Sequence, residues 1–228
     1  MVGRTHAPPR DAGTRCSGAP PRPRHAPPST GTLPGVLPRS GLVATLLFAL
    51  LVLAGCGGEP PASFDPTGAC TADGSAPGAY PELEARIPKT FHDAAPATVD
   101  SGRNCSPEAM GSLTTAGIEE LRFGGGTWSF GAERTLALAV FSAPGLTADL
   151  VGDFYASSAD AAGRTTILQQ SSPTIAGRHA RRLDTKTSER LQSVVVWPSA
   201  DPDIVNVVIT NDLPEDRIQE AIATFGER

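Results

Sequence analysis

The feature that most limits what this chain can fold into is an apolar run over residues 42–53, LVATLLFALLVL, interrupted only by Thr45. A bilayer-spanning helix needs about 20 apolar residues, so this run is too short to cross a membrane core. Its length suits the apolar region of a secretory signal peptide, which is about 7–15 residues long. Arg39 supplies the positive charge that precedes such a region. We therefore expect residues 41–55 to direct export and to be removed.

The run ends on the tetrapeptide Leu53-Ala54-Gly55-Cys56. This tetrapeptide resembles the lipobox of bacterial prelipoproteins, in which a leucine and two small residues precede a cysteine. The resemblance implies that Cys56 receives a diacylglyceryl thioether carrying fatty acids such as palmitate, and becomes the N-terminal residue after cleavage. It also implies a lipid-anchored protein on the extracytoplasmic face of the cell membrane. The alternative, a buried cysteine that ends a core helix, is disfavoured by the basic flank and the glycine-rich exit.

Residues 1–40 are rich in proline and arginine and contain no lysine. Such a segment has too little apolar surface to offset its chain entropy, so we expect it to be disordered. It is either a basic cytoplasmic arm or the result of a start site assigned too early, with translation beginning near Val36. We prefer the second interpretation, because the charged regions that begin signal peptides are short.

The charge balance disfavours nucleic acid as a partner. Cleavage before Cys56 would remove six of the 19 basic residues and one of the 24 acidic residues, which changes the net charge from −5 to −10. A protein that neutralises phosphates needs a basic surface instead. We expect the partners to be the membrane, through the lipid anchor, and either an envelope protein or a small ligand.

Cysteine usage agrees with export. Outside the lipobox and the segment before it, only Cys70 and Cys105 remain, an even pair suited to an oxidising compartment. A bridge between them would stabilise the fold by about 3–4 kcal/mol in the chain-entropy model. A zinc site is disfavoured, because neither His92 nor His179 lies at ligand spacing from a cysteine. We expect no cofactor.

The rest of the chain divides into a tether and a domain. Residues 56–79 are dominated by glycine, proline, serine and alanine, so they are expected to form a flexible tether that carries the lipid. No internal repeat follows. Residues 80–228 are therefore expected to form a single globular domain.

Capping residues and apolar spacing predict the elements of this domain. Helices are expected to start at Pro81, after Ser106, after Thr147 and at Pro214. Strands are expected over residues 134–141, 165–175, 179–184, 191–197 and 204–210, with weaker candidates at 121–123 and 127–130. Consecutive strands joined by short turns predict an α+β fold. Its mainly antiparallel sheet would carry helices on one face, as a two-layer sandwich.

Three segments of the domain carry a second resemblance. They are ELEARIP at residues 82–88, a helix that follows a strand ending in APG, and the late strand–strand–helix unit. Together they resemble small α+β domains of uncharacterised exported lipoproteins. This resemblance implies a fold and no activity.

No nucleophile elbow, phosphate loop, metalloprotease motif or calcium-binding loop is present in the sequence. Gly124-Gly125-Gly126 resembles a phosphate cradle but lacks the lysine and the following helix, so a flexible hairpin or bulge is favoured. Trp128 is a weak candidate for an exposed aromatic binding platform. A sheet tryptophan packed against a neighbour is the favoured alternative.

The main basic cluster consists of Arg178, His179, Arg181 and Arg182. On a strand, Arg178 and Arg182 would share one face, and the other two residues would share the opposite face. Arg178 and Arg182 are weak candidates for contact with anionic headgroups or an acidic ligand. The alternative is a solvated strand whose arginines pair with carboxylates such as Asp184. His179 could act as a general base, but we can name no nucleophile for it.

Five acids near the C-terminus are candidates for a weak calcium site or, more simply, for turn and helix-start residues. They are Asp201, Asp203, Asp212, Glu215 and Asp216. Two functional hypotheses remain. The favoured one is a non-enzymatic lipoprotein that binds a ligand or partner, and the alternative is an extracytoplasmic hydrolase with a scattered Ser-His-Asp site built on His179 or His92. A histidine within hydrogen-bond reach of both a serine and a carboxylate in a cleft would favour the hydrolase.

Overall fold

A computed structural model describes residues 64–131, 133–188 and 190–225. The predictions for the extension at 1–40, for the export segment at 41–55 and for lipidation of Cys56 lie outside these residues.

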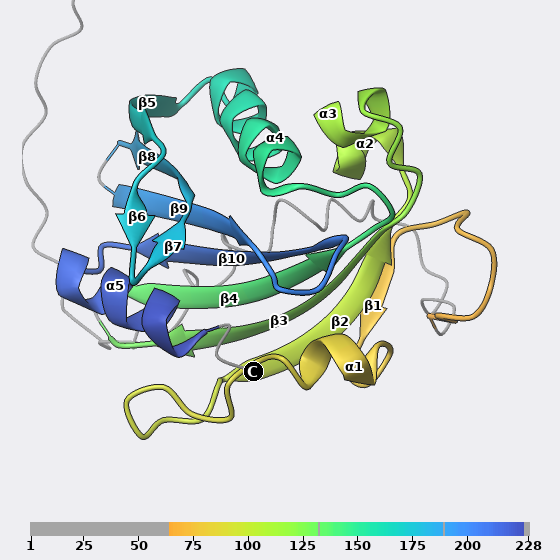
Figure 1. The fold of residues 1–228 in the computed structure, drawn as a ribbon, viewed down its shortest axis with the longest axis horizontal. Helices are drawn as coiled ribbons and strands as arrows, with labels where there is room; N and C mark the ends of the chain where they lie inside the picture. The colour runs from red at the N-terminus through yellow and green to blue at the C-terminus, as the bar shows by residue number, and fades with distance from the viewer. Residues whose placement is uncertain (1–63, 132, 189, 226–228) are drawn as a thin grey trace, which may run out of the picture. The chain divides into compact units, whose positions relative to one another are not determined.

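The described residues are organised around an eight-stranded antiparallel sheet with the order β1-β2-β3-β4-β10-β9-β8-β5 (Figure 1). A separate two-stranded ribbon pairs β6 with β7. The strands are β1 (Gly74–Ala76), β2 (Thr98–Asn104), β3 (Leu121–Ser129), β4 (Thr135–Ser142), β5 (Thr165–Ser171), β6 (Thr174–Ile175), β7 (Arg178–His179), β8 (Arg181–Thr187), β9 (Arg190–Pro198) and β10 (Ile204–Asn211).

Helices cover both faces of this sheet (Figure 1). They are α1 (Pro81–Glu84), α2 (Pro107–Met110), α3 (Ser112–Thr115), α4 (Ala148–Ala161) and α5 (Glu215–Thr224). One buried cluster joins α1 and α5 to one face through Leu83, Trp197 and Ile222. The other joins α2, α3 and α4 to the opposite face, with Val151 and Val196 among its members.

The predicted α+β class with a mainly antiparallel sheet is confirmed. The structure differs from the expected two-layer arrangement in that helices lie on both faces rather than on one. Strand β4 shows why. Leu136, Leu138 and Val140 enter the cluster under α1 and α5, whereas Ala139 and Phe141 pack against the cluster under α4. A strand that is apolar on both sides needs cover on both sides.

Most of the predicted helices and strands are present, with two notable differences in their extent. The helix expected after Ser106 is interrupted at Gly111, whose φ of 50° is unfavourable for a side chain, so α2 and α3 are separate turns. Strand β3 runs without a break through the glycine triplet, which was expected to form a hairpin or bulge. Strands β1 and β2 were not predicted.

The glycine triplet lets α1 lie directly on the sheet. A Cβ at Gly124 would stand 2.8 Å from Leu83 Cβ, and one at Gly126 would stand 2.7 Å from Ile87 Cγ2. Real Cβ atoms do not approach other heavy atoms this closely, so packing requires glycine at positions 124 and 126, whereas a Cβ at Gly125 would come no closer than 3.4 Å to another atom. The prediction of a flexible hairpin is therefore wrong, and β2 and β4 flank the triplet where a phosphate cradle would need open backbone.

Residues 64–79, which we call the N-terminal strap, correct the expected tether at 56–79. Within the strap, β1 pairs with β2 at the sheet edge, and Phe64 packs against the core. The predicted Cys70–Cys105 disulfide is confirmed, with the two Cα atoms 5.5 Å apart. The folded part therefore includes residues from Phe64 onward, because short polar contacts and one covalent bond hold a segment whose composition indicated a linker.

Candidate functional site

A groove of about 560 Å³ lies between the start of α4, the β9–β10 turn and the junction of β7 with β8. We call it the α4 groove. Its lining residues belong to four segments of the chain, at positions 146–149, 172, 179–181 and 198–205.

Hydrogen bonds fix the walls of the α4 groove. Thr147 caps α4, and its hydroxyl accepts a hydrogen bond from the Leu150 N–H at 3.2 Å. Asp203 adopts a φ of 62°, and its carboxylate accepts a hydrogen bond from the Gly145 N–H at 2.9 Å. The Asp203 carbonyl accepts another from the Ala143 N–H. These contacts join the β9–β10 turn to the loop before α4, so the groove is formed by positioned backbone.

The floor of the α4 groove is apolar and its rim is polar. Ala180 and Val205, both buried, contribute to the floor together with Ile204. On the rim, the Arg181 guanidinium donates to Asp149 and to Asp153, each at 2.9 Å. Because two carboxylates face this one cation, the rim offers hydrogen-bonding groups without an uncompensated positive charge.

A smaller hollow of about 200 Å³ shares Ser172 and Arg181 with the α4 groove. It lies under α4 against Leu183 and Val196, and Tyr155 forms part of its wall. Burial raises the pKa of Tyr155, so its hydroxyl stays protonated at neutral pH. This tyrosine can therefore donate or accept a hydrogen bond at the wall of the hollow.

The basic cluster is divided between two helices. Arg178 donates to the Ile222 carbonyl at the end of α5, and its guanidinium lies over the Trp197 ring at 5.7 Å. Arg182 pairs with Asp184 at 3.0 Å and with Glu215 at 2.8 Å. Arg178 and Arg182 thus both lie on the α5 side, but on β7 and β8, two strands of different sheets, rather than on the single strand that the prediction assumed. Their partners support the alternative that these arginines pair within the protein rather than with a ligand.

Trp128 does not form an exposed platform. Its side chain is 2% exposed, and its indole N–H donates to the Ala94 carbonyl at 3.0 Å. The prediction of an aromatic binding surface at this residue is corrected to the packed sheet tryptophan that the sequence also allowed. The correction follows from the position of Trp128 on β3, beneath Ile87 and Phe91 of the same cluster.

Neither histidine of the described domain has the surroundings that a hydrolase site needs. His92 contacts Glu220 at 2.8 Å and also Arg217. His179 lies on the rim of the α4 groove, with its Nδ1 3.2 Å from the Thr174 hydroxyl. Within the described ranges, no hydrogen bond joins either histidine to a serine.

The five acidic residues near the C-terminus do not gather into a metal site. Asp201 pairs with Arg86, and Asp212 accepts a hydrogen bond from the Leu191 N–H at 2.9 Å. Asp216 lies with Glu215 in the first turn of α5. In the part of the chain that the structure describes, no group of three or more His, Cys, Asp or Glu residues is placed to hold a metal ion.

The sequence identified several residues that line the α4 groove, but it did not show that they come together in one site. It identified Thr147 as a cap, residues 198–203 as a turn and His179 as a candidate base. The missing step was the register of β10 with β4, which places Ile204 opposite Ser142 and so brings the β9–β10 turn beside the start of α4. Nothing in the local sequence reports this pairing of distant segments.

Comparison with protein-family models and with curated proteins gives no match to this chain. Among the described residues, no helix combines the length and the apolar character needed to cross a membrane.

Proposed function

We propose that this chain is an extracytoplasmic lipoprotein, anchored in the cell membrane by lipid on Cys56. Its domain binds a small ligand or a segment of an envelope protein in the α4 groove, without turnover. The lipobox-like sequence before Cys56 and the disulfide between Cys70 and Cys105 support the location, since disulfides persist in oxidising compartments.

The α4 groove is the single observation that supports the binding role. Its volume of about 560 Å³ falls in the range of about 300–1,000 Å³ that is usual for small-molecule sites. An apolar floor with a few polar rim groups is also typical of such sites. The hydrolase alternative has no comparable support, because the contacts of His92 and His179 do not include a serine nucleophile in the described residues.

Lipid anchoring is tested by changing Cys56→Ser. A diacylglyceryl group provides two chains, and each buried methylene contributes about 0.8 kcal/mol, so the wild-type protein should stay on the membrane. The variant should lose both membrane retention and metabolic labelling with a fatty acid. Continued labelling of the Cys56→Ser protein would contradict the assignment.

The binding role is tested by filling the groove. Ala200 is exposed and lines the groove, so Ala200→Trp should occupy it and abolish capture of a ligand or partner. The matched control is Ala95→Trp, at an exposed position outside both hollows, which should bind as the wild type does. Equal binding by both variants would contradict a site in the α4 groove.

A further inference from the structure

The N-terminal strap is fastened to the domain by few apolar contacts. Its strand β1 has three residues, and Phe64 is its main apolar contact with the core. Most of the strap residues between these two features are exposed. The strap ends at Tyr80, which is 5% exposed and whose N–H donates to the Ser101 hydroxyl at 2.8 Å. Tyr80 is therefore a fixed point. Gly78, two residues before it, has a φ of 79° and is a suitable hinge, but its N–H donates to the Glu84 carboxylate at 2.6 Å, so this hydrogen bond must break when the strap opens.

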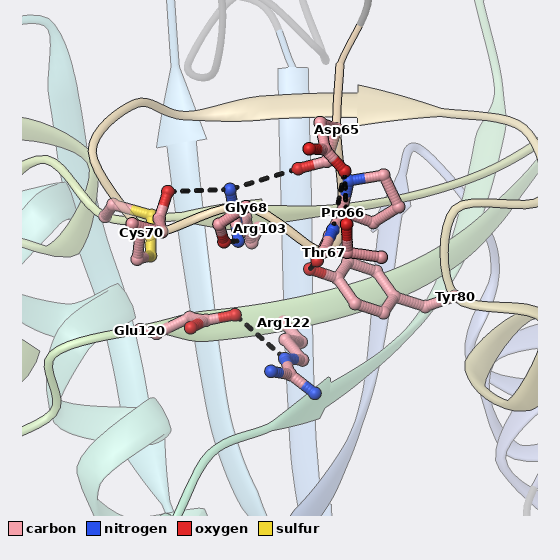
Figure 2. A network of polar contacts seen from close by, with 11 residues as sticks. Asp65, Pro66, Thr67, Gly68, Cys70, Tyr80, Arg103, Glu120 and Arg122 are labelled. Atoms are coloured by element: carbon pink, nitrogen blue, oxygen red, sulfur yellow. Dashed lines mark hydrogen bonds and ion pairs between the residues drawn. A yellow bond between two sulfur atoms is a disulfide. The ribbon is translucent and has the colours of Figure 1, made fainter.

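Arg103 on β2 is a buried cation that depends on the strap. Its side chain is enclosed, with 5% of the residue exposed, and its guanidinium donates to the carbonyls of Gly68 at 2.7 Å and Ala69 at 3.0 Å (Figure 2). The Asp65 carbonyl accepts a third hydrogen bond at 3.2 Å. No carboxylate within the described residues pairs with this guanidinium, and its Nε has no partner there. Opening the strap would let water reach a cation that is now held by three strap carbonyls and by the face of the Phe64 ring, 5.6 Å away.

The disulfide lies next to the strap carbonyls that bind Arg103. Cys70 follows the Arg103-binding carbonyls directly, and it is bonded to Cys105, which comes one residue after the end of β2 and two residues after Arg103. On the far side of Cys70, the Asp73 carboxylate accepts hydrogen bonds from the N–H groups of Cys105 at 2.6 Å and Ser106 at 2.8 Å. The disulfide thus lies between the carbonyls that bind Arg103 and the Asp73 carboxylate, and both cysteines are partly exposed.

We propose that the Cys70–Cys105 bond is a redox-sensitive lock on the strap, which sets how far the anchored domain can stand from the membrane. The distance argument rests on the proposed lipidation of Cys56. With the strap closed, the chain from Cys56 to Phe64 spans at most about 28 Å. With the strap released, the chain from Cys56 to Tyr80 spans at most about 85 Å.

The chemistry of opening is a thiol–disulfide exchange. A dithiol reductant, either small or on a protein, supplies two electrons and two protons. The bond between the two sulfur atoms breaks, two cysteine thiols form, and the reductant becomes a disulfide. Opening is confined to the strap, because the clusters under α4 and under α5 are built almost entirely from residues after Tyr80.

The lock is tested by hydrogen exchange of the full lipidated protein in vesicles of phosphatidylethanolamine and phosphatidylglycerol, with and without dithiothreitol. Reduction should speed exchange of amides 64–79 by at least tenfold and leave β9 and β10 unchanged. The variant Cys70→Ser with Cys105→Ser should exchange like the reduced protein and should not respond to dithiothreitol. Unchanged strap exchange, or equal acceleration across β9 and β10, would overturn the lock.

The reach of the domain is measured on the same vesicles. A dye on Lys186, in a Lys89→Arg background, should transfer less energy to an acceptor lipid after reduction, because the released strap lets the domain move away. Unchanged transfer with an opened strap would overturn the inference about distance. Flotation of the vesicles reports the anchor separately. If the protein did not float with the vesicles, lipidation of Cys56 would be contradicted. The hydrogen-exchange result would still decide whether the disulfide locks the strap.

Discussion

The two covered faces of the sheet and the N-terminal strap are held by different forces. On the faces, fully buried side chains such as Trp197, Ile222 and Val196 pack between helices and strands. Between the strap and the sheet, the buried Arg103 of β2, the Asp73 carboxylate and a disulfide take the place of an apolar core. Apolar packing makes unfolding of the faces cooperative, whereas a polar and covalent fastening can open locally.

The strongest way to break the packed region is to remove its largest fully buried side chain. Trp197 is 2% exposed and meets Phe225 edge-on, with ring centroids 5.7 Å apart. Trp197→Ala should lower the free energy of unfolding by about 3–5 kcal/mol, because it leaves a cavity between β9 and α5. Urea denaturation measures this, with Leu168→Ala as a control because Leu168 is 54% exposed. Equal losses in both variants would contradict the assignment of the core.

The fit of α1 on the sheet gives the second prediction. Gly124→Ala should destabilise the protein by about 1–3 kcal/mol, because its Cβ would lie 2.9 Å from the backbone carbon of Leu83. Gly125→Ala is the matched control in the same strand, since its Cβ would approach no atom closer than 3.4 Å. Thermal unfolding of the two variants decides the point, and a larger loss for Gly125→Ala would contradict this packing.

The polar fastening of the strap gives the third prediction. Arg103→Met keeps most of the side-chain volume but removes three hydrogen bonds from a charged donor to strap carbonyls, which should cost about 1–3 kcal/mol. The Asp65 and Ala69 carbonyls still accept from the N–H groups of Gly68 and Thr71. The loss should appear as faster exchange of amides 64–79. The control is Arg134→Met, an exposed arginine whose guanidinium donates to the Phe130 carbonyl and not to the strap. Equal strap exchange in the two variants would show that Arg103 does not hold the strap.

The smallest expected effect is a pH dependence of the strap. Burial alone would raise the pKa of Asp73, but hydrogen bonds from Cys105 and Ser106 outweigh it and hold the pKa below its usual value. A lowered folded-state pKa stabilises the fold above the unfolded value of about 3.9, and this contribution is lost as the pH falls through the folded pKa.

The size of this effect should be less than about 1 kcal/mol, since solvent screens a largely exposed carboxylate. The difference in unfolding free energy between the wild type and Asp73→Asn should therefore shrink as the pH falls below about 4. Asp160→Asn, at an exposed position on α4, is the control. A difference that grew on acidification would contradict the role of Asp73.

The contrast between apolar packing on the sheet faces and polar fastening of the strap also explains which elements the sequence could predict. Apolar periodicity and capping residues identified α4, α5, β4, β9 and β10, because those elements are built by burial of alternating or helically spaced side chains. Strand β2 was missed because its buried residues include Ser101, Arg103 and Asn104, which give no apolar pattern. Their burial depends on partners in the strap and in β3, which are distant in sequence.

The candidate site was predictable only in fragments. Residues 198–203 were recognisable as a turn and Thr147 as a helix cap from local chemistry. Their meeting in the α4 groove depends on the pairing of β10 with β4, which is a long-range property of the sheet. The prediction of a flexible hairpin at the glycine triplet was wrong for the same reason, because the requirement for glycine comes from α1, which lies over β3.

Photo-crosslinking in intact cells tests whether the membrane-anchored domain binds through the α4 groove. A photoreactive phenylalanine analogue placed at Ala200 reports contacts in the groove, and the same analogue at Ala95 reports the exposed surface elsewhere. We expect a discrete adduct from position 200 that is absent from position 95 and is lost when Cys56→Ser removes the anchor. An identical adduct pattern from both positions, or none from position 200 in the anchored protein, would contradict it.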